Sequence, residues 1–140
     1  MYKSYNILFV ISAITVTIFL TGCGHVYTRN EIIGTWVSND GGRLEFSELG
    51  VQATRIPQYV LLDETFKPSK ELCSGKGKWS IKDDIIDINF KPVIFSDGSA
   101  MESGYGTYMS MTGKGKSMKI FFTIGDPDSM DYYELKRLQN

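Results

Sequence analysis

The stretch GKWSIKDDIIDINF, Gly77–Phe90, decides the fold class of this 140-residue chain. Polar residues separate the three apolar residues that follow the Asp83-Asp84 pair: Ile86, Ile88 and Phe90. Residues two positions apart lie on the same face of a β-strand, so this segment has one apolar face and one polar face. That alternation is typical of antiparallel sheets that pack one face on a core. The acidic pair lies between two β-forming segments and predicts a hairpin turn.

Two further stretches share this pattern. GTWVSNDGGRLEF (34–46) and GTYMSMTGKGKSMKIFF (106–122) each begin with glycine, any residue and an aromatic residue, and each has a turn-forming segment between two extended ones. The chain has 14 glycines, which suit tight turns better than helices. The best helical candidate, LLDETFKPSKEL (61–72), is interrupted by Pro68, which leaves room for one short helical turn. The sequence predicts an all-β antiparallel meander of about eight strands.

Gly34-Thr35-Trp36 indicates how the meander closes. This motif resembles the Gly-x-Trp that opens the first strand of lipocalins. The resemblance covers the first strand by motif and the rest of the chain by the rhythm of the meander. It implies a small lipocalin-like barrel, closed at one end by the tryptophan, with a β-sandwich as the alternative architecture. Trp36 and Trp79 are both expected to be buried.

The N-terminal residues have the pattern of an export signal. Lys3 is the only charged residue before Ile7–Leu20, a run that is apolar except for a few hydroxyl residues. A membrane-spanning helix needs about 20 apolar residues, so this run is short for a span. A basic start, a short apolar core and small residues at its end are typical of a secretory signal peptide.

The apolar run ends in Leu20-Thr21-Gly22-Cys23, which resembles the lipobox of bacterial lipoproteins. The resemblance implies cleavage before Cys23, diacylglycerol on its sulfur and a fatty acyl chain on its new amine. Several acyl chains hold a small domain on a bilayer. An uncleaved signal anchor with an incidental cysteine is the alternative.

This resemblance also implies how the chain is divided and where it resides. Residues 1–22 are a signal peptide, residues 23–30 a lipidated tether, and residues 31–140 a single β domain. Gly24 occupies the position at which an aspartate resembles the inner-membrane retention signal of lipoproteins. Glycine there implies the cell envelope, on the periplasmic face of the outer membrane.

The composition argues against nucleic acid as a partner. The formal net charge is −1, and no basic cluster is dense enough to follow a phosphate backbone. The expected partners are the membrane, through the lipid on Cys23, and either an envelope protein or a small apolar ligand.

Residues that carry catalysis are sparse. The single histidine, His25, lies in the predicted tether, where it cannot easily meet a nucleophile in the core. Asp126, Asp128 and Asp131 could suit calcium, but they lack the EF-hand pattern, and Pro127 favours a turn capped by Asp126. We predict no enzyme activity, no cofactor and no metal site.

Cys73 is the other cysteine of the chain. With Cys23 acylated it has no internal disulfide partner. A small, partly buried hydrophobe is the favoured interpretation, with a reactive thiol or an intermolecular bridge as alternatives.

The predicted function is a non-enzymatic binding module. Tyr105 and Tyr108 lie beside methionines and close to the basic loop around Lys114, which makes these three the candidate partner-binding residues. The alternative is that these residues belong to an ordinary face of the sheet and bind no partner.

A second hypothesis is a periplasmic inhibitor or immunity-type protein that blocks a hydrolase or toxin. Ser103-Gly104-Tyr105 and Lys114 weakly resemble the Ser-Gly loop of lipid-anchored lysozyme inhibitors. A cavity would favour a ligand carrier, and a filled core with an exposed loop would favour an inhibitor.

Overall fold

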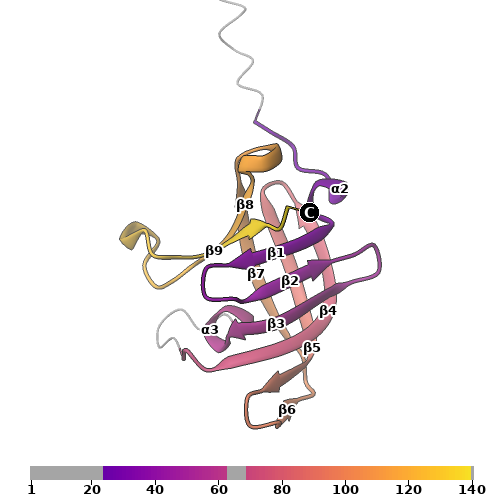
Figure 1. Ribbon diagram of the computed structural model, residues 1–140, viewed down its shortest axis with the longest axis vertical. Helices are drawn as coiled ribbons and strands as arrows, with labels where there is room; N and C mark the ends of the chain where they lie inside the picture. Colours follow the sequence, from indigo (N-terminus) through magenta and orange to yellow (C-terminus); the bar gives the residue numbers. More distant parts are fainter. Residues whose placement is uncertain (1–23, 63–68, 140) are drawn as a thin grey trace, which may run out of the picture.

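The computed structural model describes residues 24–62 and 69–139 (Figure 1). The predicted signal peptide and Cys23 lie outside the described residues. Nine strands follow one another in the chain: β1 (Gly34–Ser38), β2 (Arg43–Phe46), β3 (Val51–Pro57), β4 (Leu72–Lys82), β5 (Ile85–Phe95), β6 (Ala100–Met101), β7 (Tyr105–Thr112), β8 (Lys119–Thr123) and β9 (Tyr132–Arg137). Within the described residues, four short helical elements accompany them: α2 (Arg29–Ile32), α3 (Gln58–Leu61), η2 (Gly115–Ser117) and η3 (Pro127–Ser129).

The strands form one sheet that closes on itself. Its order is β4-β3-β2-β1-β9-β8-β7-β5-β6, and β4 also pairs with β5. Every pairing is antiparallel, and β1 and β9, the first and last strands, are neighbours. Eight strands therefore make a closed barrel, to which β6 adds a short edge beside β5. The prediction of an all-β, lipocalin-like barrel is confirmed, and the β-sandwich alternative is wrong.

Alternation along each strand fills the interior. Ile86, Ile88 and Phe90 of β5 are all 0% exposed, as the opening stretch of sequence predicted. The same alternation places these residues of other strands in the core: Leu44, Phe46, Met109, Met111, Ile120, Phe122 and Leu135. The predicted hairpin turn is present between β4 and β5, with Asp83 in the left-handed region at φ 57°.

The helix α3 packs against the interior at one end of the barrel. Val60 and Leu61 are fully buried, and the ring of Tyr59 lies 6.2 Å from that of Phe122. The hydroxyl of Thr107 donates to the carbonyl oxygen of Val60 at 2.7 Å, so this buried polar side chain is satisfied. This helix precedes the candidate stretch 61–72 and shares only Leu61 with it; residues 63–68 of that stretch lie outside the described part, and Leu72 begins β4.

The barrel has two distinct ends. The upper end in Figure 1 carries α2, the turn after β4, the loop between β7 and β8, and the last described residues. The lower end carries the β1–β2 turn, α3, the β5–β6 hairpin and the loop between β8 and β9, which lie at the left and at the bottom of the barrel in Figure 1. The terms upper end and lower end are used below in this sense.

Trp36 is the best test of the packing. Both tryptophans are buried as predicted, Trp36 at 0% and Trp79 at 6% exposure. The indole N–H of Trp36 donates to the carbonyl oxygen of Ile32 at 2.8 Å, and the guanidinium of Arg137 lies 5.0 Å from its ring centroid.

Trp36→Ala is expected to lower the free energy of unfolding by about 3–5 kcal/mol, because it leaves a large cavity in a closed core. Urea unfolding followed by circular dichroism measures this change. Tyr108→Ala is the control, since that side chain is 58% exposed and its loss should cost no more than about 0.5 kcal/mol. Equal costs for the two substitutions would contradict the assignment of Trp36 to the core.

Candidate interaction surfaces

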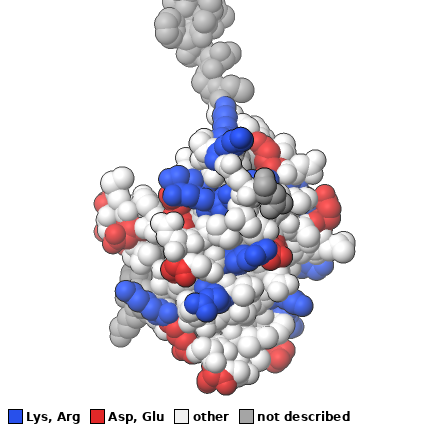
Figure 2. Space-filling model, viewed as in Figure 1, with Lys and Arg blue, Asp and Glu red and all other residues white. Residues whose placement is uncertain are grey.

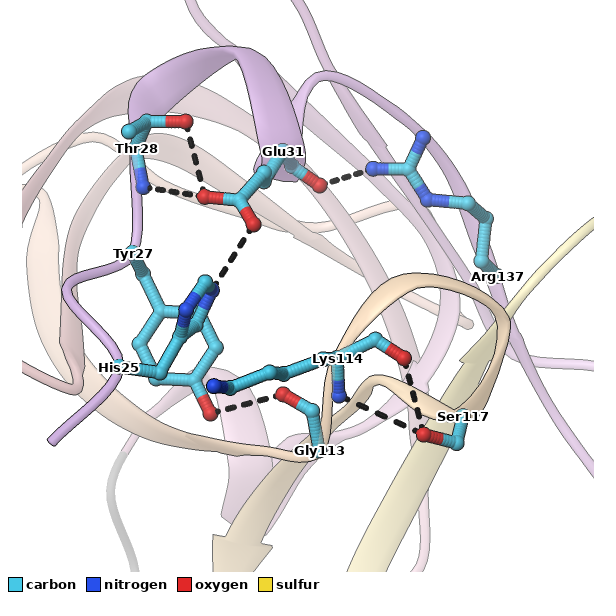
Figure 3. Close-up of polar contacts among 8 residues, drawn as sticks. All are labelled: His25, Tyr27, Thr28, Glu31, Gly113, Lys114, Ser117 and Arg137. Atoms are coloured by element: carbon cyan, nitrogen blue, oxygen red, sulfur yellow. Dashed lines mark hydrogen bonds and ion pairs between the residues drawn. The ribbon is translucent and has the colours of Figure 1, made fainter. Parts of the chain in front are cut away.

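The N-terminal segment is attached to the upper end of the barrel. The hydroxyl of Tyr27 donates to the carbonyl oxygen of Gly113 at 3.1 Å (Figure 3). The guanidinium of Arg29 donates to the carbonyl oxygens of Trp79 and Glu48 at 3.2 and 3.0 Å, and lies 3.8 Å above the ring of Trp79. The part of the predicted tether from Tyr27 onward therefore contacts the barrel directly.

A carboxylate organises the turn that leads into β1. The backbone N–H and the hydroxyl of Thr28 donate to one carboxylate oxygen of Glu31 at 2.8 and 2.9 Å, and Nε2 of His25 lies 2.9 Å from the other (Figure 3). The N–H of Thr28, its hydroxyl and His25 together hold the pKa of Glu31 below its ordinary value. This is the arrangement of a capping box, in which a side chain satisfies a free backbone donor at a helix start.

The C-terminal residues complete the upper end. The guanidinium of Arg137 donates to the backbone carbonyl of Glu31, which joins the last strand to α2 (Figure 3). Beside it lies a cleft of about 480 Å³ whose walls include Lys116, Met118 and Leu138. Leu138 is 43% exposed, an apolar side chain beside two cationic ones.

The three predicted partner-binding residues do not form one surface. Tyr105 and Tyr108 are 41% and 58% exposed, and Lys114 is exposed. Tyr105 begins β7 at the lower end, whereas Lys114 follows β7 at the upper end. The 8 residues of β7 extend over about 25 Å. The strand itself therefore separates these two residues.

The methionines expected beside these tyrosines also lie elsewhere. Met109 and Met111 are 1% and 4% exposed and belong to the core. Tyr108 is one residue out of phase with them, so its side chain lies on the outside of the barrel. The predicted patch is thus divided between the two faces of β7.

An aromatic cluster on the outer wall was missed from the sequence. Ser110 pairs with Phe121, which places Tyr108, two residues earlier, diagonally across from Phe121. The ring of Tyr132 lies 5.1 Å from that of Phe121 in an edge-to-face arrangement, and Tyr132 is 43% exposed. We call Tyr108, Phe121 and Tyr132 the wall patch. The doublets Phe121-Phe122 and Tyr132-Tyr133 could have indicated it, because strand alternation turns one ring of each doublet outward.

A polar cluster at the lower end ties the β1–β2 turn to β9. The hydroxyl of Tyr133 donates to Oγ of Ser38 at 2.8 Å and lies 3.1 Å from Oδ1 of Asp40. Burial, helped by the charge of Asp40, raises the pKa of Tyr133, which stays protonated at neutral pH. Partial burial acts to raise the pKa of Asp40, but hydrogen bonds from Ser38, the N–H of Gly42 and Tyr133 outweigh it and lower that pKa. At neutral pH Asp40 is charged and Tyr133 is protonated, and their hydrogen bonds join the turn to the last strand.

Two further predicted features, the turn at Asp126 and the burial of Cys73, are found in the structure. Oδ1 of Asp126 accepts from the N–H of Asp128 at 2.9 Å, which confirms the capped turn. Within residues 24–62 and 69–139, no group of three or more His, Cys, Asp or Glu side chains could hold a metal ion. Cys73 is 3% exposed and its thiol donates to the carbonyl oxygen of Ile56 at 3.4 Å, which confirms its interpretation as a buried hydrophobe.

Comparison with known proteins identifies no relative of the chain. No protein-family model matches the chain, and no curated protein or solved structure is significantly similar to it. Among the described residues, no helix has the length and apolar character needed to cross a membrane.

Glu31→Gln is expected to loosen the N-terminal segment without unfolding the barrel. At neutral pH the amides of residues 28–33 should exchange hydrogen several-fold faster than in the wild type, because the charged carboxylate that binds Thr28 and His25 is lost. The lowered pKa of Glu31 means that this stabilisation is present above the ordinary value of 4.5 and is lost as the pH falls below it. The two proteins should therefore converge in acid.

Hydrogen exchange read by mass spectrometry on the detergent-solubilised protein makes this comparison. Glu48→Gln is the matched control, because that carboxylate is 69% exposed and lies 3.8 Å from Arg29. Equal exchange in wild type and Glu31→Gln at neutral pH would show that the cap does not hold the segment.

Proposed function

We propose that the chain is a lipoprotein of the cell envelope, anchored through Cys23 on the periplasmic face of the outer membrane, whose barrel binds another protein without catalysing a reaction. Support for the anchor comes from Leu20-Thr21-Gly22-Cys23 at the end of a short apolar run. The first described residue, Gly24, follows that cysteine directly, and the chain meets the barrel at Tyr27.

The observation that carries the binding role is the filled interior. A carrier of small apolar ligands needs a concave apolar pocket of about 300 Å³ or more inside its walls. Here Trp36, Phe90 and Met109 are at most 1% exposed, and α3 packs against the interior at the lower end. Five of the clefts on the described part of the chain, of about 280–480 Å³, open to solvent. These features support an exterior binding surface and a protein partner.

The wall patch is the surface that suits this partner best. Interfaces between proteins are enriched in tyrosine and other aromatic residues, which contribute large contact areas at low entropic cost. Tyr108 and Tyr132 present exposed rings on either side of Phe121. Asp87 lies opposite Tyr108 on β5, and Glu134 lies opposite Phe121 on β9, so charged side chains border the patch. An apolar centre with a polar rim is the usual anatomy of such an interface.

An inhibitor or immunity-type protein is the second candidate, and a different observation favours it. The β5–β6 hairpin projects below the barrel in Figure 1. The loop that follows β6 contains Ser103 and Gly104, with Gly104 at φ 79°, where residues with a side chain are rarely found. Tyr105 comes next and is 41% exposed. A rigid protruding loop on a filled barrel suits insertion into the cleft of an enzyme.

Cys23→Ser is expected to abolish processing and acylation. Without the thiol there is no acceptor for diacylglycerol, so the precursor should keep its signal residues and run as a larger species. Labelling cells with an alkyne analogue of palmitate and visualising the protein on a gel measures both effects. Cys73→Ser is the matched control and should be processed and labelled like the wild type, because that thiol is buried in the barrel. Normal labelling of Cys23→Ser would contradict the lipoprotein proposal.

The double variant Tyr108→Ala/Tyr132→Ala is expected to lose its envelope partners in an affinity capture after chemical cross-linking of cells. Stability should change little, by about 1 kcal/mol or less, since both rings are outside the core. Tyr105→Ala is the comparison that separates the two candidates. Loss of partners with the double variant supports the wall patch, and loss with Tyr105→Ala alone supports the inhibitor loop. If both variants keep every partner and remain folded, the proposed exterior surfaces are wrong.

A further inference from the structure

We propose that the upper end of the barrel rests on the membrane and binds anionic lipids. Lys114 and Lys116 contact the headgroups, and Leu138 lies beside them as apolar surface; we call these three residues the basic rim. This inference rests on the proposed function for the anchor itself. It adds a fixed orientation for the barrel and a lipid-binding surface.

The first argument is the reach of the chain. Tyr27 is tied to Gly113, and Arg29 to the carbonyl oxygens of Trp79 and Glu48. Only Gly24, His25 and Val26 separate this attachment from Cys23. Four extended peptide units span at most about 14 Å, so an acyl group on Cys23 keeps the upper end close to the lipid surface. The electrostatic screening length at physiological salt is about 8 Å, which brings charges on this end within range of the headgroups.

The second argument is the charge of the basic rim. Lys114 and Lys116 are exposed, and neither forms an ion pair with any residue that the structure describes. The loop that carries them is held by Ser117, whose hydroxyl donates to the carbonyl oxygen of Lys114 at 2.9 Å. Each lysine near an anionic membrane surface strengthens binding by a factor of about five.

The third argument is the chemistry of the cleft beside that loop. Lys116 and Arg137 supply positive charge, Glu31 supplies one negative charge, and Met118 and Leu138 supply apolar surface around a space of about 480 Å³. A lipid headgroup offers the complementary pair, a phosphate and an adjoining glycerol and acyl region. The cleft therefore favours a lipid over a purely apolar or purely polar ligand.

The other charges of the barrel select the side that faces the membrane. The upper end also carries acids: Asp83 and Asp84 in the turn between β4 and β5, Glu31 in α2, and Glu48 beside Arg29. The barrel should therefore tilt to bring the β7–β8 loop closer to the lipid. The described loops of the lower end carry these acids and would be repelled: Asp40, Glu71, Asp97, Glu102, Asp126, Asp128 and Asp131. Figure 2 shows basic side chains near the end from which the N-terminal segment emerges, with acidic ones beside them, and mainly acidic side chains at the bottom of the molecule.

The test places a fluorophore on one introduced cysteine of the acylated protein, at Gln139→Cys beside the basic rim or at Ser99→Cys on the lower end. Each protein is reconstituted into vesicles of phosphatidylcholine alone, or mixed with phosphatidylglycerol, that contain a lipid with a nitroxide on its headgroup. We expect strong quenching at residue 139, little at residue 99, and stronger quenching at 139 when phosphatidylglycerol is present. Lys114→Gln/Lys116→Gln should lose most of that increase. Lys76→Gln/Lys91→Gln removes the same charge from the wall and the lower end and should keep it.

The outcomes separate this inference from the proposed function. If the wild type floats with the vesicles but residues 139 and 99 are quenched alike, the orientation is wrong while the anchor stands. If residue 139 is quenched equally in neutral and anionic vesicles, or the two lysine variants behave alike, the basic rim does not bind anionic lipid. If the acylated protein fails to float at all, both the anchor and the orientation are wrong.

Discussion

Each strand of this chain has one apolar face that must leave water, and the rest of the structure depends on that constraint. A single antiparallel sheet can hide such a face only by packing on another layer or by curling until its own edges meet. Here β4 and β5 supply the last pairing, and the apolar faces of eight strands share one interior. Because large buried side chains occupy that interior, the outer surface and the ends of the barrel are the regions available for recognition.

The two ends and the wall of the barrel carry different chemistry. The upper end gathers the N-terminal segment, the Glu31 cap and a loop with two lysines. The lower end is acidic and includes the structural cluster of Tyr133, Ser38 and Asp40. Between them the wall patch is the exposed aromatic surface we consider best suited to a partner. In our proposal the upper end contacts lipid, and the wall and the lower end face the periplasm.

Local alternation made the strands predictable, and it did not make the surface predictable. The two-residue spacing of Ile86, Ile88 and Phe90 predicts that they are buried, and the Gly-x-Trp motif predicts the same for Trp36. The wall patch depends on the register between β7, β8 and β9, which no single segment encodes. The contact from Tyr27 to Gly113 joins residues 86 positions apart, so a polar segment was interpreted as a simple tether. Tyr105 and Lys114 were grouped because they are near in sequence, although an extended strand carries nearby residues far apart.

The pairing of β1 with β9 has a consequence for the biogenesis of the chain. Trp36 lies opposite Arg137 in that pairing, and the N–H of Leu138 donates to the carbonyl oxygen of Thr35 at 2.9 Å. One edge of β1 therefore stays unpaired until the residues of β9 have been synthesised. Until β9 has been synthesised the barrel cannot close, because β1 and β8 both lack their partner strand. The topology thus postpones closure of the barrel until its last strand has been made, which suits the export that we propose.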